Sequence, residues 1–275
     1  KNSNFGLMQV VDSPSGNVRY YLNDYLTQNI FDPKEDKSLT VFTYMLRGLT
    51  HAYHPSPEKV LCIGLGVGIV PMQLAKEGST IDVVEINPGV VEIGEKFFGL
   101  DKSTFNLHLE DGRYFLNASK EEYDVVILDA FLGDSSPSHL MSRECFESMS
   151  QRMENDAVLV INAFGHFSEG EDFFMASLDK TLRAVFKSVH IHDGTRGNVF
   201  FVASKKEGLE PHRSMDMSEV HPKLIPFVET AWKNTIDANP ESGIILTDNY
   251  NPVEYYDSKI REEIRLNFAL NMRGK

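Results

Sequence analysis

A glycine-rich turn after a short apolar run is the feature that most constrains this chain. Residues 60–63 (VLCI) show no alternation of polar and apolar side chains, which is typical of a strand covered on both faces. The sequence GLGVG follows at positions 64–68, and a helical pattern runs from Val70 to Lys76. Glycines at such a turn allow a sharp bend and a close approach of the backbone to a ligand. The pattern predicts a strand, a turn and a helix around a ligand site.

Strands and helices alternate through the middle of the chain. Further strands are expected over Ile81–Ile86, Phe105–Leu109, Tyr123–Leu128 and Ala157–Ile161. Helices are expected between and after them, over Pro88–Phe98, Gly112–Ser119, Ser142–Met153 and Asp172–Phe186, and a closing hairpin over Val189–His192 and Asn198–Ala203. Such alternation indicates a sheet with helices on both faces. The predicted fold class is therefore α/β, with a doubly wound, mostly parallel, Rossmann-like sheet.

The two ends of the chain differ from this middle part. At the amino end, Leu7–Val11 and Asn17–Leu26 flank a turn-rich SPSG cluster and predict a small antiparallel β element. Ser38 is expected to cap a helix over Leu39–Ala52. At the other end, helices are expected over Glu219–Trp232 and Ser258–Met272. The predicted parts are a β element (1–37), an α/β domain (38–204), and a linker with a helical tail packed on that domain (205–275).

Composition and charge exclude several classes of protein. Two cysteines exclude a disulfide scaffold and a four-cysteine zinc site, and the nine histidines show no metal-ligand spacing, so no metal is expected. The net charge of −13 disfavours a nucleic-acid partner, because phosphate backbones would be repelled. No run reaches the roughly 18 apolar residues of a membrane-spanning helix. No signal peptide is visible, so a cytoplasmic location is expected, and an upstream membrane segment stays open.

Carboxylates stand at the ends of three predicted strands. Glu85 lies 21 positions after Gly64, where a carboxylate can accept hydrogen bonds from both hydroxyls of a ribose. Asp111, followed by Gly112, can accept a hydrogen bond from an adenine amino group, cap the next helix, or do both. Asp129 ends the fourth strand. Because ligands of open α/β sheets bind at the carboxyl ends of strands, these carboxylates are expected around one crevice.

The glycine turn departs from the dinucleotide-binding pattern. Ile69 and Pro71 follow the turn, so the last glycine of that pattern is missing. An S-adenosyl nucleoside has no pyrophosphate to hold and is the other user of this geometry. His139 and His166 follow predicted strand ends, where they could line the crevice, and are interpreted as surface histidines.

Together these segments resemble the spermidine synthase, or polyamine aminopropyltransferase, family, in a divergent bacterial branch. The resemblance runs from Tyr21 to Ala203. It is carried by HPSPEKVL (54–61), the glycine turn, VVEINP (83–88), EDGR (110–113) and YDVVILD (123–129), and the sequence LTDNYNPVE (246–254) is similar to the ending of spermidine-synthase-like proteins.

The resemblance implies an enzyme that transfers an aminopropyl group from a donor of the S-adenosylmethionine type to an amine and releases methylthioadenosine. Asp129 and Asp134 would be catalytic. The nucleoside would be bound by Gly64, Gly66, Gly68, Glu85, Asp111 and Gly112. The resemblance also implies a sheet of the class I methyltransferase type, a polyamine partner and a homodimer. It leaves open whether the donor is S-adenosylmethionine or its decarboxylated form.

The chain departs from the family in the half of the site that holds the amine. Val67 and Leu132 stand where the family has aspartates, and Phe42 and Thr43 replace a Tyr-Gln pair. Asp134 or Asp248 could substitute for the missing carboxylates. Three other readings therefore stay open: acceptor-independent cleavage of S-adenosylmethionine by a lyase, methyl transfer, and a non-catalytic nucleoside-binding domain.

Overall fold

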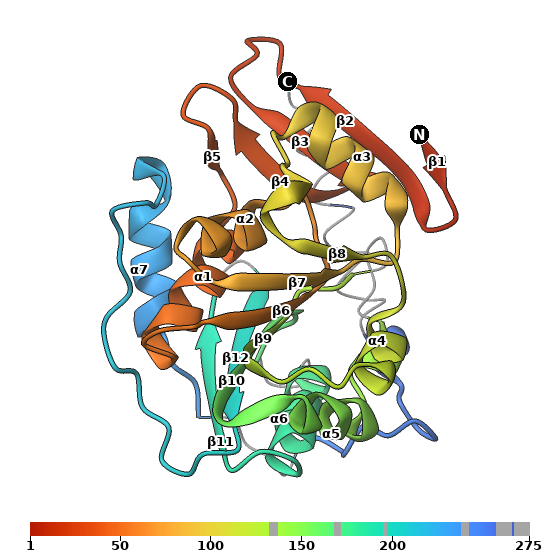
Figure 1. Cartoon of the computed structure of the whole chain (residues 1–275), viewed down its shortest axis with the longest axis vertical. Helices are drawn as coiled ribbons and strands as arrows, with labels where there is room; N and C mark the ends of the chain where they lie inside the picture. The colour runs from red at the N-terminus through yellow and green to blue at the C-terminus, as the bar shows by residue number, and fades with distance from the viewer. Residues whose placement is uncertain (132–136, 168–171, 195–196, 238–241, 257–265, 267–275) are drawn as a thin grey trace.

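The computed structural model describes residues 1–131, 137–167, 172–194, 197–237, 242–256 and 266. Five short strands near the amino end form an antiparallel sheet in chain order. They are β1 (Asn2–Ser3), β2 (Gly6–Asp12), β3 (Arg19–Asn23), β4 (Leu26–Asp32) and β5 (Lys37–Ser38). This sheet packs beside α3 (Pro88–Phe97) at one end of the molecule (Figure 1). The predicted amino-terminal β element is confirmed.

A second sheet of seven strands forms the centre of the protein. Its order is β11-β12-β10-β9-β6-β7-β8. The strands are β6 (Lys59–Ile63), β7 (Thr80–Val84), β8 (Asn106–His108), β9 (Tyr123–Leu128), β10 (Met153–Phe164), β11 (Ser188–Asp193) and β12 (Asn198–Ser204). Pairing is parallel from β10 through β8, whereas β12 is antiparallel to both of its neighbours. The strand order turns back at β6, which places the topological switch point beside the glycine turn.

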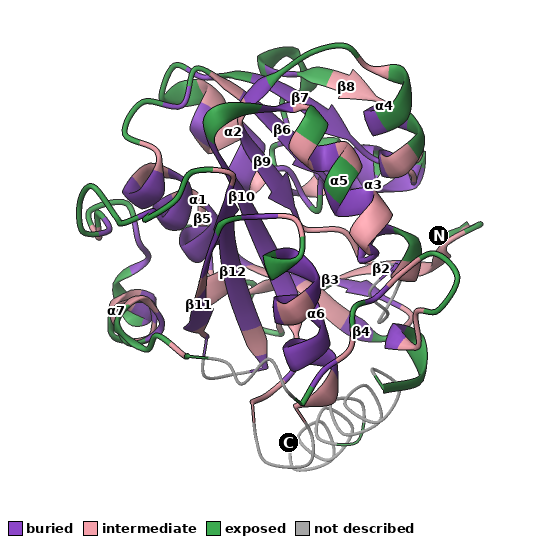
Figure 2. Cartoon of the chain, turned by 90° about the horizontal axis from the view of Figure 1, so that it is seen from below, coloured by how far each residue is buried: buried purple, intermediate pink, exposed green. Residues whose placement is uncertain are grey.

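Helices cover both faces of this sheet. The residues of β6 alternate between two hydrophobic clusters: Val60 and Cys62 face one, and Leu61 and Ile63 face the other. The first cluster includes α3, α1 (Val41–Tyr53), α2 (Ile69–Lys76) and α7 (Ile225–Lys233), and the second includes α4 (Gly112–Ala118), α5 (Arg143–Gln151) and α6 (Phe173–Arg183). Figure 2 shows the central strands almost wholly buried between these layers. The predicted doubly wound α/β fold is confirmed.

Two local predictions were wrong. Ser38 does not cap α1: it lies in β5 and accepts a hydrogen bond from the backbone N–H of Thr40, which is the residue at the N-cap. The helix predicted over Glu219–Trp232 begins only at Ile225, after a 3₁₀ turn over Pro222–Leu224. A helix from residue 219 would carry Pro222 and Pro226 in its body, where proline lacks the N–H that the helix needs.

The carboxyl end is described only in part. The helix predicted over Ser258–Met272 lies outside the described residues, apart from position 266. Within the described part of the chain, no helix has the length and apolar character to cross a membrane. The division into three parts at residues 37 and 204 stays a prediction.

Candidate active site

A cavity of about 310 Å³ lies between the carboxyl ends of the parallel strands and the amino-terminal sheet. The central sheet brings to it six of the residues predicted for the site: Gly64, Gly66, Glu85, Asp111, Gly112 and Asp129. They come from the segments that follow β6, β7, β8 and β9. Gly68 is the N-cap residue of α2 and is not in the lining. Asp134 and Leu132 lie outside the described residues.

The glycine turn passes unusually close to Asp129. Gly64 has a φ of 97°, and a Cβ atom added there would lie 2.2 Å from the carbonyl oxygen of Asp129. No other residue type fits at such a distance, so glycine is required for the two strand ends to meet. Val67 in the same turn is buried and lines a smaller cavity of about 20 Å³ that adjoins the first.

Glu85 connects the second strand to the glycine turn. One carboxylate oxygen accepts a hydrogen bond from the backbone N–H of Leu65 at 3.0 Å, and the other accepts from the N–H of Asn87 at 2.7 Å. Burial raises the pKa of Glu85, and the backbone hydrogen bonds oppose that shift. Each carboxylate oxygen has a second lone pair, so the group can still accept hydrogen bonds from a ligand in the cavity.

Asp111 has partners on both oxygens. Oδ1 accepts from the N–H of Tyr114 and caps α4, and Oδ2 lies 2.9 Å from Nε2 of His139. Burial acts to raise the pKa of Asp111, but the hydrogen bonds from Tyr114 and His139 outweigh it and hold the pKa below its usual value. His139 is exposed at the surface, as predicted, and it also lines the cavity.

Asp129 receives a hydrogen bond of 2.8 Å from the side-chain nitrogen of Asn162. Asn162, in β10, in turn accepts one of 2.9 Å from the side chain of Asn198 in β12. Burial raises the pKa of Asp129 to about 6, although the bond from Asn162 acts to lower it. A carboxyl group with this pKa is ionised at neutral pH yet close to the range in which a general base works best.

Sequence reasoning missed Asn162, Asn198 and the wall formed by the amino-terminal sheet. Asn162 could have been found as the one polar residue in the run VLVINAF of β10. The wall carried no such signal. This sheet and the start of α1 contribute aromatic, aliphatic, hydroxyl and amide side chains and no charged one: Phe5, Tyr21, Asn23, Thr27, Gln28, Asn29, Ile30, Leu39, Thr40, Val41 and Phe42. Of these, Phe42 was already named for the site from the sequence.

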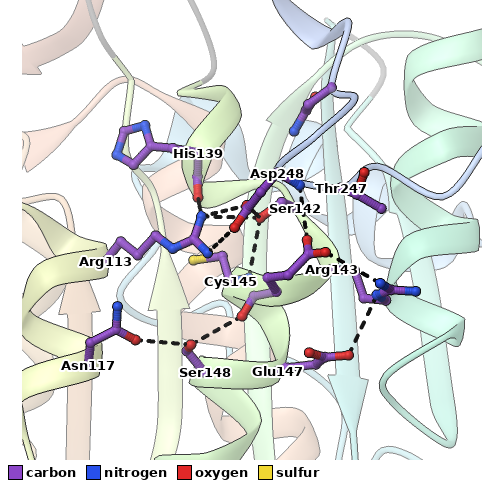
Figure 3. A network of polar contacts seen from close by, with 12 residues as sticks. Arg113, Asn117, His139, Ser142, Arg143, Cys145, Glu147, Ser148, Thr247 and Asp248 are labelled. Atoms are coloured by element: carbon purple, nitrogen blue, oxygen red, sulfur yellow. Dashed lines mark hydrogen bonds and ion pairs between the residues drawn. The ribbon is translucent and has the colours of Figure 1, made fainter.

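An ion pair and hydrogen bonds hold the described carboxyl-terminal segment against α4, near Asp111. Arg113 binds Asp248 through two nitrogens, one of them at 2.6 Å, and also donates to the carbonyl oxygen of His139 at 3.2 Å. Ser142 donates to the same aspartate at 2.6 Å (Figure 3). Arg113 therefore joins α4, the segment that carries His139, and the carboxyl-terminal segment.

Comparison with known proteins decides the family. A family model for the spermine/spermidine synthase domain matches residues 40–193. A polyamine aminopropyltransferase from Vibrio vulnificus (strain CMCP6) is 31% identical over 236 residues, which cover 80% of this chain and 77% of that protein. The chain belongs to the spermine/spermidine synthase family. The predicted resemblance to aminopropyltransferase enzymes is thereby confirmed.

Solved structures agree with this family's fold. A probable spermidine synthase from Corynebacterium glutamicum ATCC 13032 matches with a TM-score of 0.67 at 14% identity, over 95% of this chain and 92% of that one. A spermidine synthase in complex with the transition state analogue AdoDATO matches with a TM-score of 0.60 at 19% identity, over 97% and 86%. At such identities the likeness shows the spermidine synthase fold alone.

Proposed function

We propose that this chain transfers the aminopropyl group of decarboxylated S-adenosylmethionine to an amine and releases methylthioadenosine. The observation that carries the proposal is the position of Asp129. Its carboxyl group, with a pKa of about 6, shares one cavity with Glu85 and Asp111 at the switch point of the sheet. A polyamine acceptor and a homodimer are parts of the same proposal.

The nucleoside is proposed to lie along the strand ends. Glu85 would accept hydrogen bonds from the ribose hydroxyls, and Asp111 would accept one from the adenine amino group. Gly64 and Gly66 would allow the donor to approach the backbone, and Gly112 lines the same wall. Gly68 would support the turn as the N-cap residue of α2 without touching the ligand.

Asp129 is proposed to be the general base. An alkyl amine has a pKa of about 10, like that of lysine, and reaches the site as an ammonium ion. The carboxylate would hold this cation and take its proton, which frees the nitrogen lone pair. The nitrogen then attacks the methylene carbon beside the sulfonium, the C–S bond breaks, and its electron pair goes to sulfur.

The cavity favours the decarboxylated donor. Among the described residues that line it there is no lysine or arginine. The carboxylate of S-adenosylmethionine would therefore enter a site without a cationic side chain, beside the carboxyl group of Asp129. Burying an unpaired charge is costly, and like charges repel each other. The decarboxylated donor avoids both penalties.

A product assay by mass spectrometry tests the proposal. The protein is incubated with each donor, with and without putrescine or spermidine, beside the variants Asp129→Asn, Asp134→Asn and Asp156→Asn. Methylthioadenosine that appears only with an amine, and is lost in Asp129→Asn but not in the exposed control Asp156→Asn, is the expected result. Loss in Asp134→Asn would assign that residue a role as well.

Three other outcomes would overturn the proposal. Methylthioadenosine formed without any amine would indicate a lyase. S-adenosylhomocysteine would indicate methyl transfer. Binding of either donor without turnover would indicate a nucleoside-binding domain.

A further inference from the structure

We infer that Asn29 holds the terminal ammonium group of the donor's aminopropyl chain. This inference rests on the proposed function, since it assigns a further contact in the same site. Asn29 lies in β4 of the amino-terminal sheet, far in sequence from the glycine turn and from Asp129.

The side-chain oxygen of Asn29 lacks a hydrogen-bond donor. This atom is buried, and only 3% of the residue is exposed. Buried polar atoms in folded proteins nearly always have a partner, so one that lacks it at the wall of a cavity points to a ligand. An amide oxygen can only accept, so the matching ligand group carries N–H or O–H.

Asn29 lies where the two cavities meet. The large cavity and the small one share five lining residues, which are Asn29, Phe42, Gly64, Gly66 and Asp129. The two glycines mark the proposed path of the donor, and Asp129 marks the reacting centre. A chain that extends from the sulfonium past the glycine turn therefore enters this junction.

The rest of the small cavity offers little to a cation. Its other lining residues are apolar or glycine-turn residues, among them Val67, Leu46 and Ile127, with Thr43 as the one further polar side chain. Within this lining Asp129 carries the single negative charge. An ammonium ion placed there needs acceptors to offset its lost hydration, and Asn29 supplies one beside Asp129.

Asn23 provides a matched control within the same wall. Its amide oxygen is also buried without a partner, and the residue lines the large cavity. It does not line the small cavity, and its side-chain nitrogen donates to the carbonyl oxygen of Phe5 at 3.1 Å. A Cβ atom added to Gly6 would lie 2.6 Å from the oxygen of Asn23, so that oxygen faces the turn between β1 and β2.

The test compares the donor with methylthioadenosine, which lacks the aminopropyl group and, with it, the positive charge on sulfur. Binding of decarboxylated S-adenosylmethionine and of methylthioadenosine is measured by calorimetry for the wild type, Asn29→Ala, Asn29→Asp and Asn23→Ala. Asn29→Ala is expected to weaken binding of the decarboxylated donor about tenfold and that of methylthioadenosine less than about twofold. Asn29→Asp is expected to restore or exceed the wild-type preference for the donor, and Asn23→Ala to leave it unchanged.

The outcomes separate this inference from the proposed function. Equal effects of Asn29→Ala on both nucleosides, or the same loss of preference in Asn23→Ala, would overturn the role of Asn29 while leaving aminopropyl transfer intact. Failure of the wild type to bind either nucleoside would overturn both. Thermal unfolding of each variant shows whether a loss of binding reflects a loss of folded protein.

Discussion

Asn162 donates a hydrogen bond of 2.8 Å to Asp129, and both side chains line the same cavity. Asn162 is almost fully buried and is itself held by Asn198. The three residues come from different segments of the sheet, so the orientation of the Asp129 carboxyl group is fixed by the sheet itself. The bond also favours the ionised form of Asp129, because it acts to lower a pKa that burial has raised.

Replacing Asn162 should therefore change how the activity depends on pH. In Asn162→Leu the carboxyl group loses its donor, so its pKa should rise above about 6 and the acid limb of kcat/KM should move to higher pH. We expect kcat/KM near neutral pH to fall by about 10- to 100-fold, consistent with loss of a bond to a charged group. Asn198→Ala, which leaves the bond to Asp129 in place, should have a smaller effect. If the acid limb of kcat/KM in Asn162→Leu stays at the wild-type pH, the bond from Asn162 does not set the pKa of Asp129.

The carboxyl group of Asp129 should destabilise the folded protein at pH values at which it is ionised. Its pKa is about 6 in the folded protein against a usual value of 3.8, so between these values the folded state binds more protons than the unfolded state. Stability therefore decreases as the pH rises through this range, by an amount on the order of 3 kcal/mol. Asp129→Asn should raise the free energy of unfolding by about 1–3 kcal/mol at about pH 8 and by less at about pH 4.

Urea unfolding at both pH values measures this difference. Asp156→Asn, which changes an exposed carboxylate in β10, is the control and should change stability little at either pH. If Asp129→Asn lowers the free energy of unfolding at the higher pH, or changes it equally at both pH values, the buried charge does not destabilise the folded protein. The same variant should be inactive, so stability and activity would change in opposite directions.

Alanine variants at Gly64 and Gly66 test whether the glycine turn passes close to the backbone of Asp129. Alanine at position 64 would combine a φ of 97° with a Cβ atom 2.2 Å from the Asp129 carbonyl, whereas alanine at position 66 would meet nothing within 4 Å. Gly66→Ala should cost about 1–2 kcal/mol from its left-handed backbone alone. Gly64→Ala should cost more than about 3 kcal/mol, because strand ends must also move apart. Equal losses in urea unfolding would refute the close approach.

The strand ends were predictable from the sequence, and the rest of the site was not. Glu85 and Asp129 follow apolar runs, and Asp111 follows a short strand of alternating apolar and polar residues. Parallel pairing brings the carboxyl ends of such strands together whatever the details of the loops. The contribution of Asn29 depends on how a separate antiparallel sheet packs across those ends. No local spacing in the sequence encodes that packing.

Side chains with two possible roles are also difficult to assign from the sequence. Asp111 was expected to bind adenine, cap a helix or do both, and the structure shows the cap together with a bond to His139. The partner could not be predicted, since the segment that carries His139 is positioned by Arg113 and by the distant Asp248. Such contacts arise only once the chain has folded.

Arg113 and Asp248 should act as a unit on donor binding. Arg113→Ala is expected to raise KM for the donor about 5- to 10-fold with little change in kcat, because the segment carrying His139 loses an anchor. Asp248→Ala should do the same, and the double variant should be no worse than either single one. Arg19→Ala is the control, since its side chain pairs with Asp12 and donates to the carbonyl oxygen of Phe97, in another part of the protein. Additive effects on KM would argue against a shared role.

His192 in β11 is expected to make the fold sensitive to acid. Its Nδ1 lies 3.0 Å from the carbonyl oxygen of Trp232, and its Nε2 lies 3.0 Å from the hydroxyl of Tyr53. Because a carbonyl oxygen only accepts, Nδ1 carries the proton, and Nε2 accepts from Tyr53. The ring also stacks on Trp232 with centroids 5.2 Å apart. The neutral imidazole thus joins α7 and α1 to the edge of the central sheet.

Burial lowers the pKa of His192 from 6.5 to about 4, so the unfolded state binds more protons between these values. Stability should be full above about pH 6.5 and should be lost as the pH falls toward 4, by up to about 3 kcal/mol. His192→Gln should lower stability at about pH 7 by about 1–3 kcal/mol, because buried partners lose a hydrogen bond, yet it should lose less on acidification than the wild type. The exposed His212→Gln is the control for urea unfolding across this range. If the wild type and His192→Gln lose stability in parallel, the acid sensitivity arises elsewhere in the protein.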